Sequence, residues 1–130
     1  MVLEIEFILY VKNQQKSTDF YCKILDATPS LNVPGMTEFK LSENFKLGLM
    51  PEDGIAKIIA KNAPNPALGN GIPRCELYLK VDTIDAYFSR AIESGAKIID
   101  AIAPSDWGDT VGYLSDLDGH VIAFASKTAI

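Results

Sequence analysis

The chain has 130 residues, 48% of them hydrophobic, and a formal net charge of −5. A chain of this length and composition can bury the core of one ordinary domain without disulfides or metal ions, and the two cysteines, Cys22 and Cys75, lack the spacing of a redox or metal pair. The acidic balance disfavours a nucleic-acid partner, and no apolar run approaches the ~18 residues of a membrane span, so we expect a soluble cytoplasmic protein with reduced, mostly buried thiols.

The first half of the chain has the pattern of a strand, then a helix, then shorter strands. Side chains alternate between two faces over residues 4–11, as in a half-buried strand. Asn13 suits a helix N-cap, and apolar residues then recur at helical spacing over residues 17–25. Strand-like runs separated by turn residues follow at 38–41 and 46–50.

The second half repeats this order. A strand pattern over residues 76–81 leads to a helix capped at residues 82–83 and stopped at residues 94–95, where glycine suits a left-handed backbone. Glu6 maps onto Glu76 at an offset of seventy residues, so a duplicated unit is plausible. Three further strand-like runs are expected at 97–102, 110–115 and 120–125.

The duplication divides a single domain, residues 1–130, into two modules. Prolines and glycines interrupt residues 63–73, which we interpret as a linker between module one, residues 1–62, and module two, residues 74–130. In each first strand one face is too polar for a dry core, because it carries Glu6 and Tyr10 in module one and Glu76, Tyr78 and Lys80 in module two. This face is expected to line a wet cavity or an interface.

Two segments resemble a known family. Residues 106–122 contain Trp107-Gly108 followed by the turn Asp116-Leu117-Asp118-Gly119 and a last strand, and residues 16–25 have the matching first-helix pattern. They are similar to the vicinal oxygen chelate superfamily of glyoxalase I, extradiol dioxygenases and bleomycin-resistance proteins, with Leu117 where that family usually has proline. The resemblance implies an α+β fold of two tandem βαβββ modules, forming curved mixed sheets around a pocket.

The resemblance also locates the family's usual metal ligands. It points to Glu6, Glu76, Ala123 and a position near Gly48. Two of these four have no donor side chain, and two carboxylates without imidazole are a poor site for zinc, nickel or iron. We therefore predict no metal cofactor. The only histidine, His120, and the turn at 116–119 are interpreted as structural.

What remains is similar to the metal-free bleomycin-resistance branch of the family. The resulting hypothesis is a homodimer that sequesters a small organic molecule in a dimeric pocket, with a cationic molecule favoured by the paired glutamates and the negative charge. Tyr113 falls where related proteins contact their ligand. The predicted ligand-binding residues are Glu6, Tyr10, Glu76, Tyr78, Trp107 and Tyr113.

Two other functions stay open at this point. The first is a lyase-, isomerase- or dioxygenase-like enzyme of the same superfamily, using Glu6 and Glu76 for acid–base or weak divalent-metal chemistry. The second is a structural module whose pocket is closed by its own side chains. In that case Trp107 closes one end of the cavity, Tyr78 is a core tyrosine and Glu6 pairs with Lys80.

Overall fold

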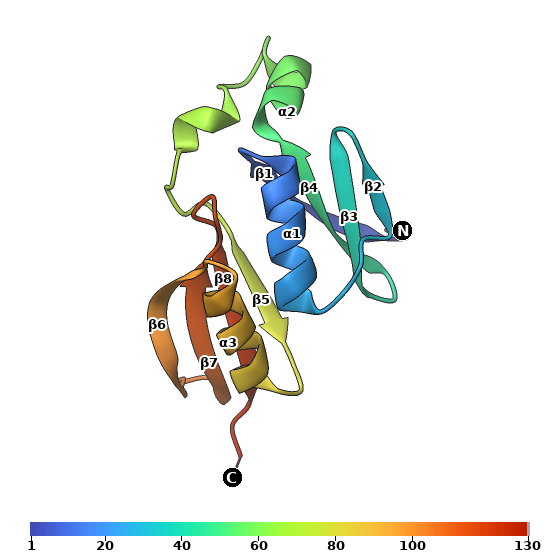
Figure 1. Ribbon diagram of the computed structural model, residues 1–130. Helices are drawn as coiled ribbons and strands as arrows, with labels where there is room; N and C mark the ends of the chain where they lie inside the picture. The colour runs from blue at the N-terminus through green and yellow to red at the C-terminus, as the bar shows by residue number, and fades with distance from the viewer. Residues whose placement is uncertain (130) are drawn as a thin grey trace. The chain divides into compact units, whose positions relative to one another are not determined.

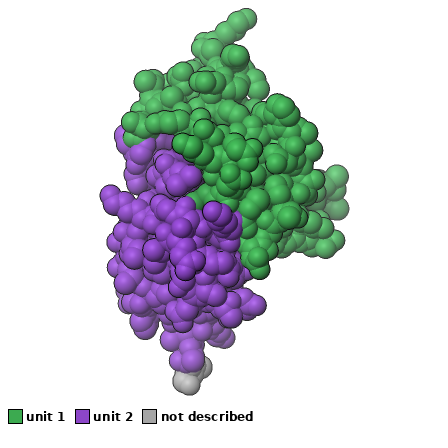
Figure 2. Space-filling model, in the orientation of Figure 1, with its two compact units in different colours: residues 1–22, 26–70 green, residues 23–25, 71–130 purple. Residues whose placement is uncertain are grey.

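A computed structural model describes residues 1–129 of the chain. It contains two compact units: unit 1 comprises residues 1–22 and 26–70, and unit 2 comprises residues 23–25 and the chain from Gly71 onward (Figure 2). Each unit contains one four-stranded mixed sheet and helical segments, so the α+β fold expected from the sequence is confirmed.

The sheet of unit 1 has the strand order β1-β4-β3-β2. β1 runs parallel to β4, and the other neighbouring pairs are antiparallel (Figure 1). The elements in chain order are β1 (Ile5–Val11), α1 (Gln14–Leu25, whose last three residues belong to unit 2), β2 (Leu31–Val33), β3 (Met36–Ser42), β4 (Phe45–Pro51), α2 (Glu52–Ile59) and the 3₁₀ turn η1 (Pro66–Gly69).

Apolar side chains on one face of this sheet form the core of unit 1. Leu9 in β1, Leu47 and Leu49 in β4 and Phe39 in β3 are all at most 1% exposed. This burial is the stabilising result of the alternation seen in the sequence. Asn13 caps α1 as predicted, because its side chain accepts a hydrogen bond from the backbone N–H of Lys16 at 3.0 Å.

Unit 2 repeats the topology with the order β5-β8-β7-β6 and the same single parallel pair, β5 with β8 (Figure 1). Leu114, Ile122 and Phe124 are fully buried on one face of its sheet, where Phe88 of α3 is also buried. Gly112 makes this contact possible, since a Cβ there would lie 2.6 Å from the Phe88 ring. The elements are β5 (Glu76–Lys80), α3 (Ile84–Glu93), β6 (Lys97–Pro104), β7 (Asp109–Ser115) and β8 (Val121–Lys127).

Four details of the predicted elements were wrong. β2 and α2 were missed, because three exposed residues carry no alternation and α2 buries only Ile55. Thr83 begins α3 without a side-chain hydrogen bond to the helix, and its hydroxyl donates instead to Asp82 at 3.1 Å. The proline-rich linker also contains η1, because Pro66 occupies the first turn, where its missing N–H costs nothing.

The structure also bears on two expectations, one about membrane-spanning segments and one about the cysteines. None of the helices within residues 1–129 has the length and apolar content needed to cross a bilayer. Cys22 and Cys75 are free thiols, as predicted, but both are half-buried rather than mostly buried. Burial is the main reason why the pKa of each thiol lies above its ordinary value.

Candidate functional site

Five of the six predicted ligand-binding residues lie on the open faces of the two sheets, opposite the cores. In β1 the register with β4 places Glu6 and Tyr10 on the face away from Leu9. In β5 the register with β8 places Glu76 and Tyr78 on the corresponding face of the second sheet. The alternation therefore predicted the faces correctly, and each face carries its own arrangement of polar groups.

The open face of unit 1 brings together two carboxyl groups. Glu38 in β3 and Ile8 in β1 both pair with Gly48 in the intervening strand. Because Gly48 has no side chain, the Glu6 carboxyl can lie over it, and a Cβ added there would be 2.5 Å from Glu6 Oε2. When one carboxyl is protonated, a hydrogen bond joins Glu6 to Glu38.

This environment makes Glu6 a weaker acid than an ordinary glutamate. Burial, followed by the hydrogen bond to Glu38 and its negative charge, raises the pKa of Glu6 to about 7. Lys46 opposes the shift, but its Nζ lies 3.2 Å from Glu4 and 3.9 Å from Glu38. Glu6 Oε2 is buried and has no hydrogen-bond partner. Glu6 can therefore donate a proton or accept one near neutral pH.

The open face of unit 2 has an apolar floor with aromatic walls. Val111 of β7 and Ala123 and Ala125 of β8 form a buried cluster, against which Tyr78 and Tyr113 pack. Ala123 and Ala125 are fully buried, and the two tyrosines that pack against them are half-buried. Apolar and aromatic side chains with a few convergent polar groups are typical of small-molecule sites, which are clefts or cavities.

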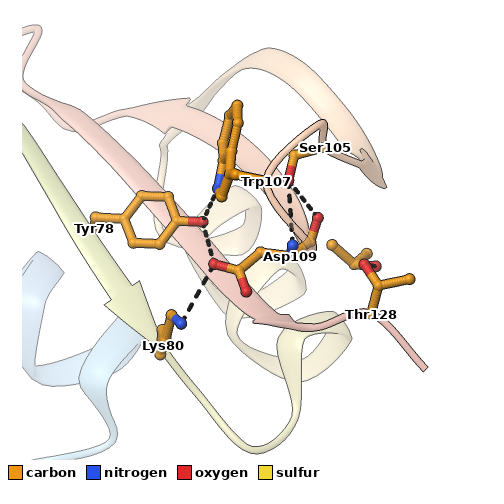
Figure 3. Close-up of polar contacts among 7 residues, drawn as sticks. Tyr78, Lys80, Ser105, Trp107, Asp109 and Thr128 are labelled. Carbon is orange, nitrogen blue, oxygen red and sulfur yellow. Dashed lines mark hydrogen bonds and ion pairs between the residues drawn. The ribbon is translucent and has the colours of Figure 1, made fainter. Parts of the chain in front are cut away.

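A chain of hydrogen bonds fixes one side of this face (Figure 3). The Trp107 Nε1–H donates to the Tyr78 hydroxyl at 2.8 Å, and that hydroxyl donates to Asp109 Oδ2 at 2.6 Å. Lys80 Nζ lies 3.5 Å from the same carboxylate oxygen. The Ser105 hydroxyl donates to the Asp109 carbonyl at 2.7 Å and so closes the turn that carries Trp107. Burial and the bond to Asp109 raise the pKa of Tyr78.

The remaining predicted residues are less tightly held. Glu76 is exposed at the start of β5, and its charge acts, after burial, to raise the pKa of Tyr113. Tyr10 is half-buried. In the structure Tyr78 and Trp107 therefore share a direct hydrogen bond, and Glu76 lies close enough to Tyr113 for its charge to affect the tyrosine.

Sequence reasoning missed two residues of these faces. Glu38 lay in a predicted strand, and pairing that strand with residues 46–50 as a hairpin would have been the signal for its place beside Gly48. Asp109 gave no local signal, because its partner Tyr78 is 31 residues away. Lys80 contacts this missed carboxylate.

The turn that carries the histidine is closed by hydrogen bonds among its own residues. Asp116 Oδ1 accepts the backbone N–H groups of Asp118 and His120, both at 2.9 Å, and Oδ2 lies 2.9 Å from His120 Nδ1. Gly119 has a φ of +88°, which favours glycine. Asp116, Asp118 and His120 each offer an atom within 4.8 Å of the others, the spacing of a cation site. The Asp116 oxygens, however, are used to hold the turn.

The positions of the family's metal ligands do not fit a transition-metal centre. Gly48 and Ala123 have no donor atoms, and Ala123 is fully buried in the floor of the unit 2 face. Glu6 is paired with another carboxyl, and the chain's one imidazole is buried against Asp116. Zinc, nickel and iron sites favour imidazole or thiolate donors, which these positions lack.

Comparison with known proteins gives one family. The profile of the Glyoxalase/Bleomycin resistance protein/Dioxygenase superfamily matches residues 4–124. An uncharacterized protein of Mycobacterium bovis is 29% identical over 115 residues, which cover 86% of this chain and 75% of that protein.

Solved structures show the same fold. A glyoxalase-related enzyme from Fulvimarina pelagi has a TM-score of 0.78 at 16% identity, covering 94% of this chain and 86% of that one. A hypothetical protein from S. aureus has a TM-score of 0.78 at 22% identity, covering 97% and 94% of the two chains. At these identities the likeness shows the fold alone.

Proposed function

Because the chain belongs to the Glyoxalase/Bleomycin resistance protein/Dioxygenase superfamily, we propose that it binds a small organic molecule without the help of a transition metal. The observation that carries this proposal is the open face of unit 2. There two half-buried tyrosines pack against a buried apolar cluster, and a tryptophan that bonds one of them is 60% exposed. An exposed indole offers its ring to a ligand, and aromatic rings bind planar or cationic groups well.

Each face, taken by itself, carries charge that favours a ligand with a cationic nitrogen. Glu76 stands exposed near Tyr113 on the unit 2 face. On the unit 1 face, the buried Oε2 of Glu6 lacks a donor, and an ammonium or guanidinium group would supply one. Such a group would also favour the ionised form of Glu6. Tyr10 lies on the same face and completes the proposed contacts.

The metal-free state is part of the proposal, and its support is chemical. Two of the four positions that the superfamily uses have no donor atom, and a carboxyl pair such as Glu6 and Glu38 suits hard cations better than zinc, nickel or iron. We also propose a homodimer, the commonest closed oligomer. Light scattering tests the dimer: a mass of 14.2 kDa at micromolar concentration would contradict it.

Calorimetric titration with bleomycin, a bulky cation with a planar aromatic segment, tests the binding function. Wild type is compared with Glu6→Gln and Glu76→Gln, which keep side-chain size and remove the charge. Each variant is expected to lose on the order of 1 kcal/mol of binding free energy. Glu43→Gln in the exposed β3–β4 turn is the matched control and should bind like wild type. Equal affinity in all four proteins would leave the glutamates without a role in binding.

One observation favours a second function, proton transfer. Glu6 titrates near neutrality beside Glu38, and such a pair can hold one proton and pass it to or from a substrate carbon or oxygen. The expected reaction is an isomerisation or elimination that begins with removal of a proton next to a carbonyl. Deuterium uptake from heavy water into a panel of carbonyl compounds, followed by NMR, tests it. Uptake that survives both Glu6→Gln and Glu38→Gln would refute it.

A further inference from the structure

We propose that Asp109 is a positioning residue, which holds the Tyr78 hydroxyl and, through it, the Trp107 indole in the arrangement that receives a ligand. This inference rests on the proposed binding function of the unit 2 face. Asp109 itself is 6% exposed, whereas Trp107 is 60% exposed. A ligand on the open face would therefore meet the indole, and the carboxylate would act only through the tyrosine.

The strand order explains how Asp109 reaches Tyr78. They belong to β7 and β5, which are separated by β8. Tyr78 pairs with Ala123 on β8 and Asp109 pairs with Lys127, so Ala125 lies between these two register positions on the same face of the intervening strand. The 2.6 Å hydrogen bond from Tyr78 to Asp109 therefore crosses β8 where its side chain is small. The same alanines that make the apolar floor thus allow the bond.

The chemistry of the three groups fixes the direction of the hydrogen bonds. The indole N–H can only donate, and an ionised carboxylate can only accept. The Tyr78 hydroxyl must therefore accept from Trp107 and donate to Asp109, as the 2.8 Å and 2.6 Å distances allow. Donation to a charged acceptor is about twice as strong as donation to a neutral one. The carboxylate consequently orients the hydroxyl lone pair that holds the indole.

Trp107 needs such an anchor. It lies in the turn between β6 and β7, next to Gly108, whose φ of +96° lies in the region that favours glycine. A mostly exposed indole without its hydrogen bond would rotate among several rotamers. Fixing one such side chain on binding weakens affinity by roughly two- to tenfold, and an indole that is held before the ligand arrives avoids this loss.

The first test needs no ligand, because Trp107 is the chain's only tryptophan and its fluorescence can be assigned. Time-resolved anisotropy of wild type should show only overall tumbling, whereas Asp109→Ala and Tyr78→Phe should add a fast local component. Asp109→Asn keeps an acceptor oxygen and should restore the slow decay. Lys80→Gln removes the 3.5 Å ion pair alone and is the matched control. Equal anisotropy decays in Tyr78→Phe and wild type would overturn the proposal, even if Asp109→Ala fails to fold.

The second test uses bleomycin as the probe in calorimetric titration. Asp109→Ala and Tyr78→Phe should weaken binding by roughly two- to tenfold, while Asp109→Asn and Lys80→Gln stay within about twofold of wild type. Unchanged affinity in Tyr78→Phe together with a loosened indole would overturn the role in binding. If wild type binds no probe but its indole is held, and both Tyr78→Phe and Asp109→Ala free it, the proposed function fails while the anchoring of Trp107 by Asp109 stands.

Discussion

Replacing Gly48 with alanine should separate the two carboxyl groups on the unit 1 face. The added Cβ would lie 2.5 Å from Glu6 Oε2, whereas ordinary van der Waals contact begins at 3.4 Å, so this oxygen must move by about 0.9 Å. Ile8 Cγ1, at 3.1 Å, needs to give by only a few tenths of an ångström. Because the carboxyl is the free end of a flexible side chain, Glu6 should rotate away from Glu38 and toward solvent.

The expected magnitude follows from what raises the pKa of Glu6. Its value of about 7, against an ordinary 4.5, comes from burial first and from Glu38 second. Gly48→Ala weakens both causes, so the pKa should fall by roughly one unit or more. The cost to folding should stay below about 1 kcal/mol, because alanine also restricts the unfolded chain more than glycine does.

The pH dependence of stability shows whether Glu6 stabilises the fold at low or at high pH. A raised carboxyl pKa means that the fold prefers protonated Glu6, so the favourable contribution is present below pH 4.5 and is lost as the pH rises toward about 7. Gly48→Ala should flatten this loss. Carboxyl-carbon NMR titration measures the pKa, and urea unfolding at pH 5 and pH 8 measures the stability.

Gly54→Ala in α2 is the matched control, because a Cβ there would have no atom within 4 Å. Its Glu6 titration should equal that of wild type. A Glu6 pKa that stays near 7 in Gly48→Ala would refute the reasoning, since the carboxyl would then not depend on the space over Gly48. A value near 4.5 in wild type would refute it as well.

Three further predictions concern the ligand, the metal and the histidine turn. The pKa of Glu6 is about 7, and a cation is expected to bind only the ionised carboxylate, so wild type should bind bleomycin about tenfold more weakly at pH 6 than at pH 8. In Glu6→Gln the affinity measured by calorimetry should not change with pH. An affinity of wild type that does not change with pH would contradict this. Elemental analysis of protein purified without chelator should find less than stoichiometric zinc, nickel, iron or manganese, and one equivalent of any of them would disprove the metal-free proposal. Asp116→Ala leaves two backbone donors and His120 without their acceptor, so thermal unfolding should show that the free energy of unfolding falls by about 2–4 kcal/mol. Asp106→Ala, at an exposed position, is the control and should change it by almost nothing. Equal melting temperatures would show that the turn holds without the carboxylate.

Much of the fold was predictable from the sequence, because it depends on local patterns. Alternation over residues 4–11 and 76–81 determined which side chains face the cores, and burial in the structure agrees. Helical spacing and the Asn13 cap placed α1, and Gly95, with a φ of +102°, lies just past α3 as expected. The turn at 116–119 and the helix-one pattern were specific enough to indicate the superfamily, which the family profile confirms.

The neighbours of each site residue depended on tertiary structure. Alternation assigns a side chain to a face, but strand order and register decide what stands beside it on that face. Glu6 meets Glu38 because β4 lies between their strands and carries Gly48 at the crossing point. Tyr78 meets Asp109 across β8, where the small Ala125 lies between their register partners Ala123 and Lys127. Pairings between residues about thirty positions apart leave no periodic trace in a single sequence, so only the folded sheets could reveal both carboxyl groups.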